Sequence, residues 1–217
     1  MKNLVIFDLD NTLIKGQSQR LLLIYMFKKR EIKLFPFLKI LLWFVFYKLD
    51  FVKNPKEIME YSFQFLKNRN VNEFEKKIGD FFEKKLKNKF FKESLDLIEK
   101  HKKEGREIII VSNAIEPLVK RAASFLGLNN FIGTKLEYQD GFFTGRIDGN
   151  IITGKNKVIE IEKFLKSDDF KEIWAYGDQI TDLPFLEIST KPFVVNPDSL
   201  LRKVAKERNW PILNFKL

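Results

Sequence analysis

Two carboxylates close to the N-terminus follow directly on a short hydrophobic segment. Leu4–Phe7 is a run typical of a buried strand, and Asp8 and Asp10 lie immediately beyond it. Ligands bind at the carboxyl ends of strands in parallel α/β sheets, where a poorly solvated carboxylate needs a cation or a ligand to offset its burial. Asp8 could attack an electrophile, while Asp10 could serve as a general acid and then a general base. The alternative is a polar strand exit with Asx-turn capping.

A second apolar run, Ile108–Val111, ends on Ser112 and Asn113. The hydroxyl and the following backbone N–H groups could bind phosphate oxygens where the next helix begins, or could form an ordinary helix cap. Lys157 lies at the start of an amphipathic run, where the helix dipole disfavours a positive charge unless an anion is near. Lys155 is the competing candidate for that role, and a solvated surface lysine is the alternative.

A third strand-like segment, Ile173–Tyr176, is followed by two more carboxylates, Asp178 and Asp182. Asp178 could bind a metal ion directly. Asp182 could hold Lys157 or a metal-bound water, or could simply cap the next helix. Because several carboxylates and an anionic phosphate repel one another, the arrangement calls for a divalent cation, and oxygen ligands favour Mg²⁺.

The order of these motifs resembles the haloacid dehalogenase superfamily of aspartyl-nucleophile phosphohydrolases. The long helical segment between the first and second motifs resembles the phosphoserine-phosphatase-like branch, subfamily IB. The matching positions are Asp8, Asp10, Thr12, Ser112, Lys157, Gly177, Asp178 and Asp182, with further likeness at Asp140, Gly141, Thr144–Ile147, Gly149, Gly154 and Val195–Asp198.

The resemblance implies that Asp8 is the nucleophile and a Mg²⁺ ligand. It implies that Asp10 is the acid and base, with its backbone carbonyl on the metal, and that Asp178 completes the protein ligands. Family members that act as dehalogenases lack the second aspartate, so the presence of Asp10 favours phosphoryl chemistry.

The same resemblance implies phosphate-binding and supporting roles. Ser112 and the Asn113 amide would bind the phosphoryl group, and Lys157 would neutralise both the phosphate and the nucleophile. Asp182 and Thr12 would not contact the metal or the phosphate themselves but would position the residues that do.

Two positions depart from the family pattern. Asn11 stands where the family usually has Gly, and Asn tolerates left-handed backbone geometry better than most residues, so we expect the loop to be preserved. Asn113 and Ala114 stand where phosphoserine phosphatases tend to have glycines, which makes phosphoserine a less certain substrate than the phosphorylated metabolites as a class.

These inferences predict a Mg²⁺-dependent phosphomonoester phosphatase that forms an aspartyl-phosphate on Asp8. The expected substrate is a small phosphorylated metabolite, with phosphoserine among the candidates. A mutase, in which the phosphoryl group passes to a second sugar hydroxyl, would use the same intermediate. The sequence does not indicate an oligomeric state.

The amino-acid composition excludes several classes of catalytic mechanism. The absence of Cys excludes thiol catalysis and disulfides, and it fits a reducing, cytoplasmic compartment. His101, the one histidine, lies among lysines on what the pattern indicates is a polar helix face, so a His-based triad is excluded. No secretory signal is expected, because the chain enters its first strand at once.

The pattern of elements predicts an α/β fold with a Rossmann-like, doubly wound parallel sheet and an inserted all-helical cap. The predicted core is 1–13 and 93–217, and the predicted cap is 14–92. Within the cap, helices are expected over Gln17–Glu31, Phe35–Leu49, Pro55–Lys67 and Glu73–Leu86, with Asn54 and Asn70 as helix caps. Further strands are expected over Glu107–Val111, around Phe131 and over Phe193–Val195, and a hairpin over Leu136–Ile152.

The positive charge of the chain is concentrated in the predicted cap. Residues 14–92 hold 19 Lys and Arg against 8 Asp and Glu, and 13 of the 23 Phe. One interpretation is a solvated basic face over a Phe-rich core. A second is peripheral contact of Leu34–Val52 with an anionic membrane, which would suit a phosphatase of lipid head groups. A third, which we consider the weakest, is a nucleic-acid-binding protein on a phosphatase-like fold. A membrane span is not expected, because the charge-free run Ile40–Tyr47 is too short.

Overall fold

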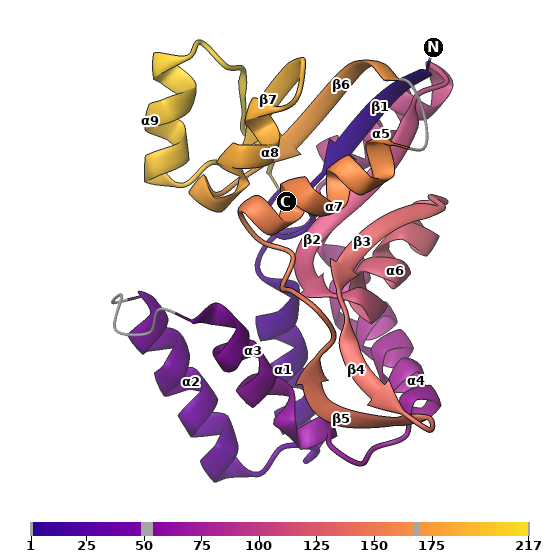
Figure 1. Cartoon of the computed structure of the whole chain (residues 1–217), viewed down its shortest axis with the longest axis vertical. Helices are drawn as coiled ribbons and strands as arrows, with labels where there is room; N and C mark the ends of the chain where they lie inside the picture. Colours follow the sequence, from indigo (N-terminus) through magenta and orange to yellow (C-terminus); the bar gives the residue numbers. More distant parts are fainter. Residues whose placement is uncertain (1, 49–53, 167–169, 217) are drawn as a thin grey trace.

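The chain folds around a six-stranded parallel sheet (Figure 1). A computed structural model describes residues 2–48, 54–166 and 170–216, except for the side chains of residues 43–48 and 55. The strand order is β3-β2-β1-β6-β7-β8, with every neighbouring pair parallel. The strands are β1 (Lys2–Phe7), β2 (Glu107–Ile115), β3 (Asn130–Thr134), β6 (Phe170–Gly177), β7 (Lys191–Val195) and β8 (Ile212–Leu213).

Helices cover both faces of this sheet, which makes it doubly wound. The alternation of side chains along β1 sends Val5 and Phe7 into one hydrophobic cluster, and Leu4 and Ile6 into another. The first cluster includes residues of α5 (Lys92–Lys103) and α6 (Glu116–Phe125). The second includes residues of α7 (Lys155–Leu165), α8 (Leu183–Glu187) and α9 (Ser199–Glu207). The predicted α/β, Rossmann-like fold class is confirmed.

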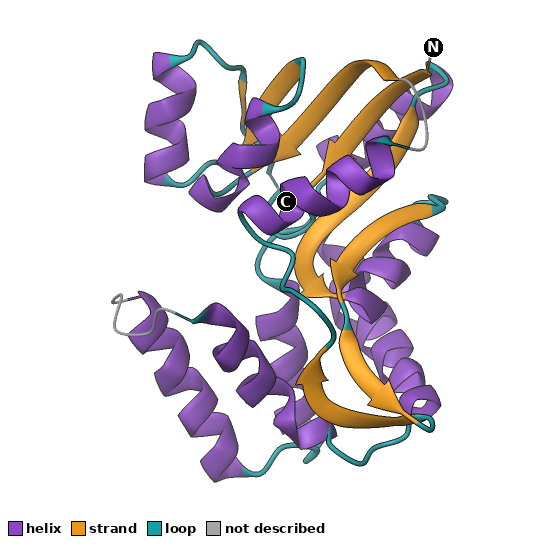
Figure 2. Ribbon diagram, viewed as in Figure 1, coloured by secondary structure: helices purple, strands orange, loops and turns teal. Residues whose placement is uncertain are grey.

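Four further helices lie beyond the carboxyl edge of the central strands (Figure 2). They are α1 (Ser18–Lys28), α2 (Leu34–Lys48), α3 (Pro55–Phe63) and α4 (Val71–Phe81), and short 3₁₀ and π turns follow α3 and α4. The side chain of Asn54 accepts a hydrogen bond from the Lys56 N–H, and that of Asn70 accepts from the N–H groups of Asn72 and Glu73. Both asparagines therefore cap helices, as their position before the helical runs predicts.

The predicted hairpin is formed by β4 (Leu136–Gln139) and β5 (Phe142–Ile147), and it packs beside α3 and α4 (Figure 1). Phe143 exchanges backbone hydrogen bonds with the chain that leads into α4: Asn68 N–H donates to its carbonyl at 2.8 Å, and its own N–H donates to Arg69 at 3.0 Å. Buried Phe143 also meets Phe74 edge-on. The hairpin thus extends the helical unit with a segment that follows β3 in sequence.

The two chain segments that join the first helices to the sheet are bonded to each other. Ile14 and Phe90 form an antiparallel bridge. On either side of it, the Lys15 N–H donates to the Lys89 carbonyl at 2.8 Å and the Phe91 N–H donates to Leu13 at 3.0 Å. The segments that enter and leave the helical unit therefore run as a short two-stranded ribbon.

The structure differs from the sequence-based expectation in two strands. β2 continues past Val111 to Ile115, because Ile115 pairs with Thr134 of β3 after a shift in register. β8 is a two-residue strand that follows Pro211, and so short a run carries no periodicity that would reveal it. Among the described residues, none of the helices has the length and the apolar character that a membrane crossing requires.

His101 lies on the buried face of α5, so its expected place on a polar face is wrong. Its exposed fraction is 2%, and the lysines around it in sequence occupy the other side of the helix. Arg106 donates a hydrogen bond to His101 Nδ1 at 2.6 Å, and Nε2 lies 3.0 Å from the Tyr176 hydroxyl. Because a guanidinium only donates, Nδ1 carries no proton and Nε2–H faces the tyrosine.

Burial, together with the charge of Arg106, lowers the pKa of His101 to about 4. A folded-state pKa below the ordinary value means that the unfolded chain takes up the proton first as the pH falls. We therefore expect the free energy of unfolding to fall by about 2 kcal/mol more in the wild type than in His101→Gln between pH 6.5 and pH 4.5. Urea unfolding at a series of pH values measures this difference, and parallel curves for the two proteins would contradict it.

Candidate active site

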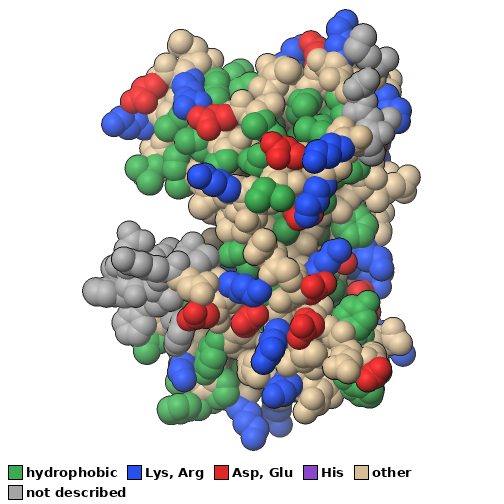
Figure 3. All heavy atoms as spheres, viewed as in Figure 1, with side chains coloured by type: hydrophobic (Ala, Val, Ile, Leu, Met, Phe, Trp, Pro, Cys, Tyr) green, Lys and Arg blue, Asp and Glu red, His purple; other side chains and the backbone are tan. Residues whose placement is uncertain are grey.

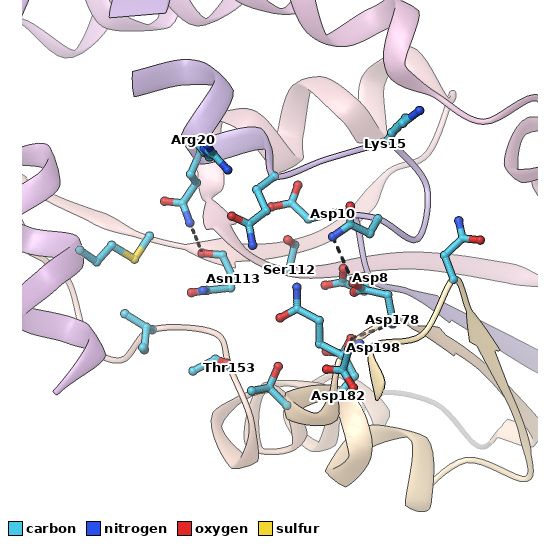
Figure 4. Close-up of a pocket in the computed structure, with 18 of the residues that line it drawn as sticks. Asp8, Asp10, Lys15, Arg20, Ser112, Asn113, Thr153, Asp178, Asp182 and Asp198 are labelled. Carbon is cyan, nitrogen blue, oxygen red and sulfur yellow. Dashed lines mark hydrogen bonds between the residues drawn. The ribbon is translucent and has the colours of Figure 1, made fainter. Parts of the chain in front are cut away.

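The register of the central strands brings three predicted site residues to one edge of the sheet. Phe7 of β1 is aligned with Ile110 of β2 and with Tyr176 of β6. Asp8 follows Phe7 directly, and Ser112 and Asp178 come two residues after the aligned positions. Figure 4 shows these side chains facing a common space, with Asp10 and Asp182 beside them.

Lys157 lies between two of the carboxylates. Its Nζ donates to Asp8 Oδ1 and to Asp182 Oδ1, each at 2.6 Å, and all three side chains are buried. Burial opposes the charge of the ammonium, but Asp182 and Asp8 outweigh that effect and raise the pKa of Lys157 above its ordinary value. Lys155, the competing candidate, is exposed. The structure therefore brings Lys157 into the carboxylate cluster.

Asp182 is held rigidly behind the other site groups. Its Oδ2 accepts hydrogen bonds from the backbone N–H groups of Asp178 at 3.1 Å and Gln179 at 3.3 Å, while Oδ1 receives Lys157. A Cβ at position 177 would lie 2.8 Å from the Asp182 Cβ, so this close approach requires Gly177.

Asp8, Asp178 and Asp182 each offer a carboxylate oxygen, and these oxygens lie within 4.8 Å of one another. Burial raises the pKa of Asp8 to about 7; Lys157 acts to lower this pKa, and the neighbouring carboxylates act to raise it. Burial and the charges of Asp8 and Asp182 raise the pKa of Asp178 to about 9. Lys157 and the Asn11 amide therefore offset only part of the negative charge of the three carboxylates. Because all the donor atoms are oxygens, the cluster fits a divalent cation such as Mg²⁺.

Asp10 and Asn11 form the loop that leaves β1. Asp10 Oδ1 accepts a hydrogen bond from the Ser18 N–H at 2.9 Å, at the start of α1. Burial raises the pKa of the Asp10 carboxyl to about 6, against the effect of the Ser18 N–H. Asn11 adopts a φ of 58°, the left-handed geometry that the sequence leads us to expect. Thr12 is buried beneath this loop, and its Oγ1 has no hydrogen-bond partner among the described residues.

The side chain of Asn11 has a role that its sequence position did not reveal. Its Nδ2 donates to Asp178 Oδ2 at 3.2 Å, and its Oδ1 accepts from the Gly16 N–H at 3.0 Å. The amide therefore connects the loop after β1 with the carboxylate after β6. The presence of Asn where the family usually has Gly was the one feature of the sequence that could have indicated a role for this side chain.

Ser112 lies within β2, not at the start of the next helix, because the strand runs on to Ile115 and α6 begins at Glu116. Its Oγ accepts a hydrogen bond from the Ala114 N–H at 3.2 Å and is buried at the sheet edge. The Asn113 side chain is exposed, and its carbonyl accepts from Thr134 Oγ1 at 2.9 Å. Both residues face the cavity described below.

Asp198 is a further residue at this edge, and its role was not predicted. Its carboxylate accepts from the Ile180 N–H at 2.9 Å and caps α9 through the Leu201 N–H at 2.7 Å. Its own N–H donates to the Asp178 carbonyl at 2.9 Å. Asp198 thereby fixes the loop that carries Asp178 and Asp182. Its place in the Val195–Asp198 motif was the available signal.

A cavity of about 1380 Å³ lies between this edge and the helices α1 to α3. The sheet side supplies the carboxylates, Ser112 and Lys157. The helical side supplies polar and apolar groups, among them Gln17, Gln19, Arg20, Leu23, Leu41, Ile58, Met59, Ser62 and Phe63. Ligand pockets of roughly 300–1,000 Å³ are typical, so the space admits an organic group well beyond the phosphate itself.

The haloacid dehalogenase-like hydrolase family profile matches residues 5–187, and the chain belongs to this family. A histidinol-phosphatase from Neisseria meningitidis is 29% identical over 235 residues, with both chains covered completely. Phosphoserine phosphatase SerB1 of Mycobacterium tuberculosis is 27% identical over 221 residues, which cover 97% of this chain and 70% of that protein. The predicted family and its phosphatase class are confirmed.

Among solved structures, a protein of unknown function from Bordetella pertussis has a TM-score of 0.85 at 23% identity, with 98% of each chain covered. At this identity, the likeness shows a shared fold. The similarity extends over the helical unit as well as the sheet, since nearly the whole of both chains is aligned.

Asn11 allows a test of the loop geometry. At a φ of 58°, Gly is unstrained, whereas Ala has a Cβ that clashes with the backbone. Both substitutions remove the same side-chain hydrogen bonds, so we expect Asn11→Gly to be more stable than Asn11→Ala by about 1 kcal/mol. Urea unfolding compares the two variants, and equal stabilities would show that the left-handed geometry is not maintained in solution.

Proposed function

We propose that the chain is a Mg²⁺-dependent phosphomonoester phosphatase that works through an aspartyl-phosphate on Asp8. The observation that carries this proposal is the position of Asp8, buried at the sheet edge and bonded to Lys157 beside two further carboxylates. A nucleophilic carboxylate needs a fixed cation next to it if it is to approach an anionic phosphate. Lys157 is such a cation.

In the proposed reaction, an oxygen of Asp8 attacks phosphorus and the bond to the leaving alcohol breaks. Asp10 gives its proton to the leaving oxygen, and the raised pKa of its carboxyl suits it to hold that proton near neutral pH. Asp10 then takes a proton from a water molecule, whose oxygen attacks phosphorus and releases inorganic phosphate and free Asp8. The Asp10 Oδ1 atom that accepts from Ser18 keeps the carboxyl oriented throughout.

We assign the metal to Asp8, the Asp10 backbone carbonyl and Asp178. When bound there, Mg²⁺ would offset the negative charge of the carboxylates and of the substrate phosphate. Asp182 supports this arrangement by holding Lys157 and the Asp178 backbone, and Thr12 by packing beneath the loop. Ser112 and the Asn113 amide are the proposed phosphate ligands from the neighbouring strand.

For the substrate, we propose a small phosphorylated metabolite, with phosphoserine and histidinol phosphate as the first candidates. The names of the mycobacterial and neisserial relatives support these two. The polar side chains Gln19, Arg20 and Ser62 on the helical side of the cavity could contact the organic group of such a substrate.

A lipid head-group phosphate is the second candidate, favoured by the apolar part of the same wall, which includes Leu23, Ile58 and Met59. The third interpretation, nucleic-acid binding, is disfavoured because the carboxylates that line the cavity would repel a polyanion.

We expect Asp8→Asn and Asp10→Asn each to reduce turnover by several orders of magnitude, because one removes the nucleophile and the other the proton donor. Asn at position 10 retains an oxygen for the Ser18 N–H, so folding should be preserved. Phosphate release from phosphoserine, histidinol phosphate, sugar phosphates and a lysophosphatidate, with Mg²⁺ and with EDTA, measures the effect. Near-normal turnover by purified Asp8→Asn would refute the mechanism.

The two lysines of α7 form a matched pair. We expect Lys157→Ala to lower turnover by about 10²–10³-fold, because it leaves Asp8 and the phosphate without their fixed cation. Lys155→Ala should stay within about twofold of the wild type, because Lys155 is exposed and lies outside the carboxylate cluster. Steady-state kinetics on the best substrate, with circular dichroism to verify folding, distinguishes the two. Similar losses in both variants would contradict the assignment.

A further inference from the structure

One side of α2 presents an apolar surface, which we call the α2 face and define as Leu34, Phe35, Leu38 and Leu42. The exposed fractions of these side chains are 61%, 81%, 52% and 50%. Their spacing places them on one side of the helix, because positions three to four residues apart share a side. The opposite side, which includes Phe37 and Ile40, is buried against the neighbouring helices.

Such a concentration is unusual on a protein surface, where large apolar side chains are normally scattered. The part of the chain that the structure describes has ten exposed large hydrophobic residues, and four of them form the α2 face. Exposed apolar clusters of this kind mark binding surfaces. Phe37 and Ile40, on the other side of the described part of the helix, are buried, so the exposure is not the result of a loose element.

The stretch of sequence that carries the α2 face is basic. Between Ser18 and Leu42 the sequence has six Lys and Arg and one acidic residue. That acid, Glu31, is already bonded to Arg69 and Lys77. Lys33 precedes the face and Lys39 lies within its helix, where its Nζ is 4.8 Å from the centre of the Tyr61 ring. In Figure 3, hydrophobic and basic side chains lie close together at the lower left, where Figure 1 places α2.

We infer that the α2 face docks the protein onto an anionic lipid surface. Apolar side chains on one side of a helix enter the interface, and nearby Lys and Arg side chains attract the anionic head groups. A second copy of the chain is a poorer partner, because a symmetric contact through this face would bring two basic surroundings together. This inference does not depend on the proposed hydrolysis.

The position of α2 connects this surface with the active-site cavity. Leu41 lines the cavity, while Leu42, the next residue, belongs to the α2 face. Leu41 also lies three residues from Leu38, so the cavity wall and the α2 face adjoin along the helix, and docking would bring the apolar wall of the cavity close to the lipid surface. A phosphomonoester with an apolar group would gain most from that proximity.

Co-sedimentation with vesicles tests the inference. The probes are vesicles of phosphatidylcholine alone and of phosphatidylcholine with an equal part of phosphatidylglycerol, at low and at high salt. We expect the 217-residue chain to bind the anionic vesicles more tightly, with affinity falling as salt rises. A double variant, Phe35→Ser with Leu38→Ser, should lose at least about tenfold in affinity.

Leu200→Ser is the matched control. Leu200 is 59% exposed on α9, far along the chain from the α2 face, and its loss should leave vesicle binding unchanged. Circular dichroism and thermal unfolding verify that each variant folds. Phosphate release measured in parallel separates docking from catalysis, because neither Phe35, Leu38 nor Leu200 lines the cavity.

Three results would overturn the inference. The first is a lack of binding to anionic vesicles at low salt. The second is unchanged binding by the folded double variant. The third is a wild-type dimer, seen by light scattering, that the double variant converts to a monomer while vesicles leave both proteins unbound. In that third case, the α2 face would be a contact between copies of the chain.

Discussion

The ion pairs between Lys157 and the carboxylates of Asp8 and Asp182 are the interactions on which the site depends. A buried carboxylate is costly, and the fixed ammonium offsets part of that cost for two of them at once. The geometry requires α7 to begin at the sheet edge, so that its third residue reaches between the ends of β1 and β6. Removing the ammonium would leave buried negative charge that the remaining protein groups do not balance.

The sheet and its loops serve this arrangement in different ways. Parallel register brings Asp8, Ser112 and Asp178 to the same edge of the sheet, while Asn11 and Asp198 fix the loops that follow the strands. Gly177 permits Asp182 to approach the backbone closely. The proposed catalytic carboxylates therefore follow buried strand ends, and the cavity wall opposite them comes from α1 to α3. In the proposed mechanism, the sheet edge would carry the chemistry and the helices would contact the organic group of the substrate.

Much of this architecture could be predicted from local patterns in the sequence. Apolar runs followed by aspartates located the strand ends, and Asn54 and Asn70 located two helix starts, because these signals depend on neighbouring residues alone. Contacts between distant residues could not be predicted in that way. The lysine neighbours of His101 in sequence predict an exposed position. Its burial depends on contacts with Tyr176 and Arg106, which the local sequence does not indicate. The Asn11 amide reaches Asp178 across 167 residues of sequence.

Two predictions stay predictions: the division of the chain into a core of 1–13 with 93–217 and a cap of 14–92, and the cytoplasmic location. The oligomeric state is an open question. The packing of the β4–β5 hairpin on the helices is the feature that no local pattern indicated. It arises from backbone bonds between Phe143 and the chain around Asn68 and Arg69, which lie more than seventy residues earlier.

The ribbon formed around the Ile14–Phe90 bridge has a mechanical meaning. Two single linkers would let the helical unit swing in any direction, whereas a hydrogen-bonded pair resists bending in its own plane and yields mainly across it. The chain that leads into and out of the hairpin adds two further crossings between the helices and the sheet. The helical unit is therefore tied to the sheet by hydrogen bonds as well as by covalent connections, and the ribbon stiffens the chain next to the cavity wall that it carries.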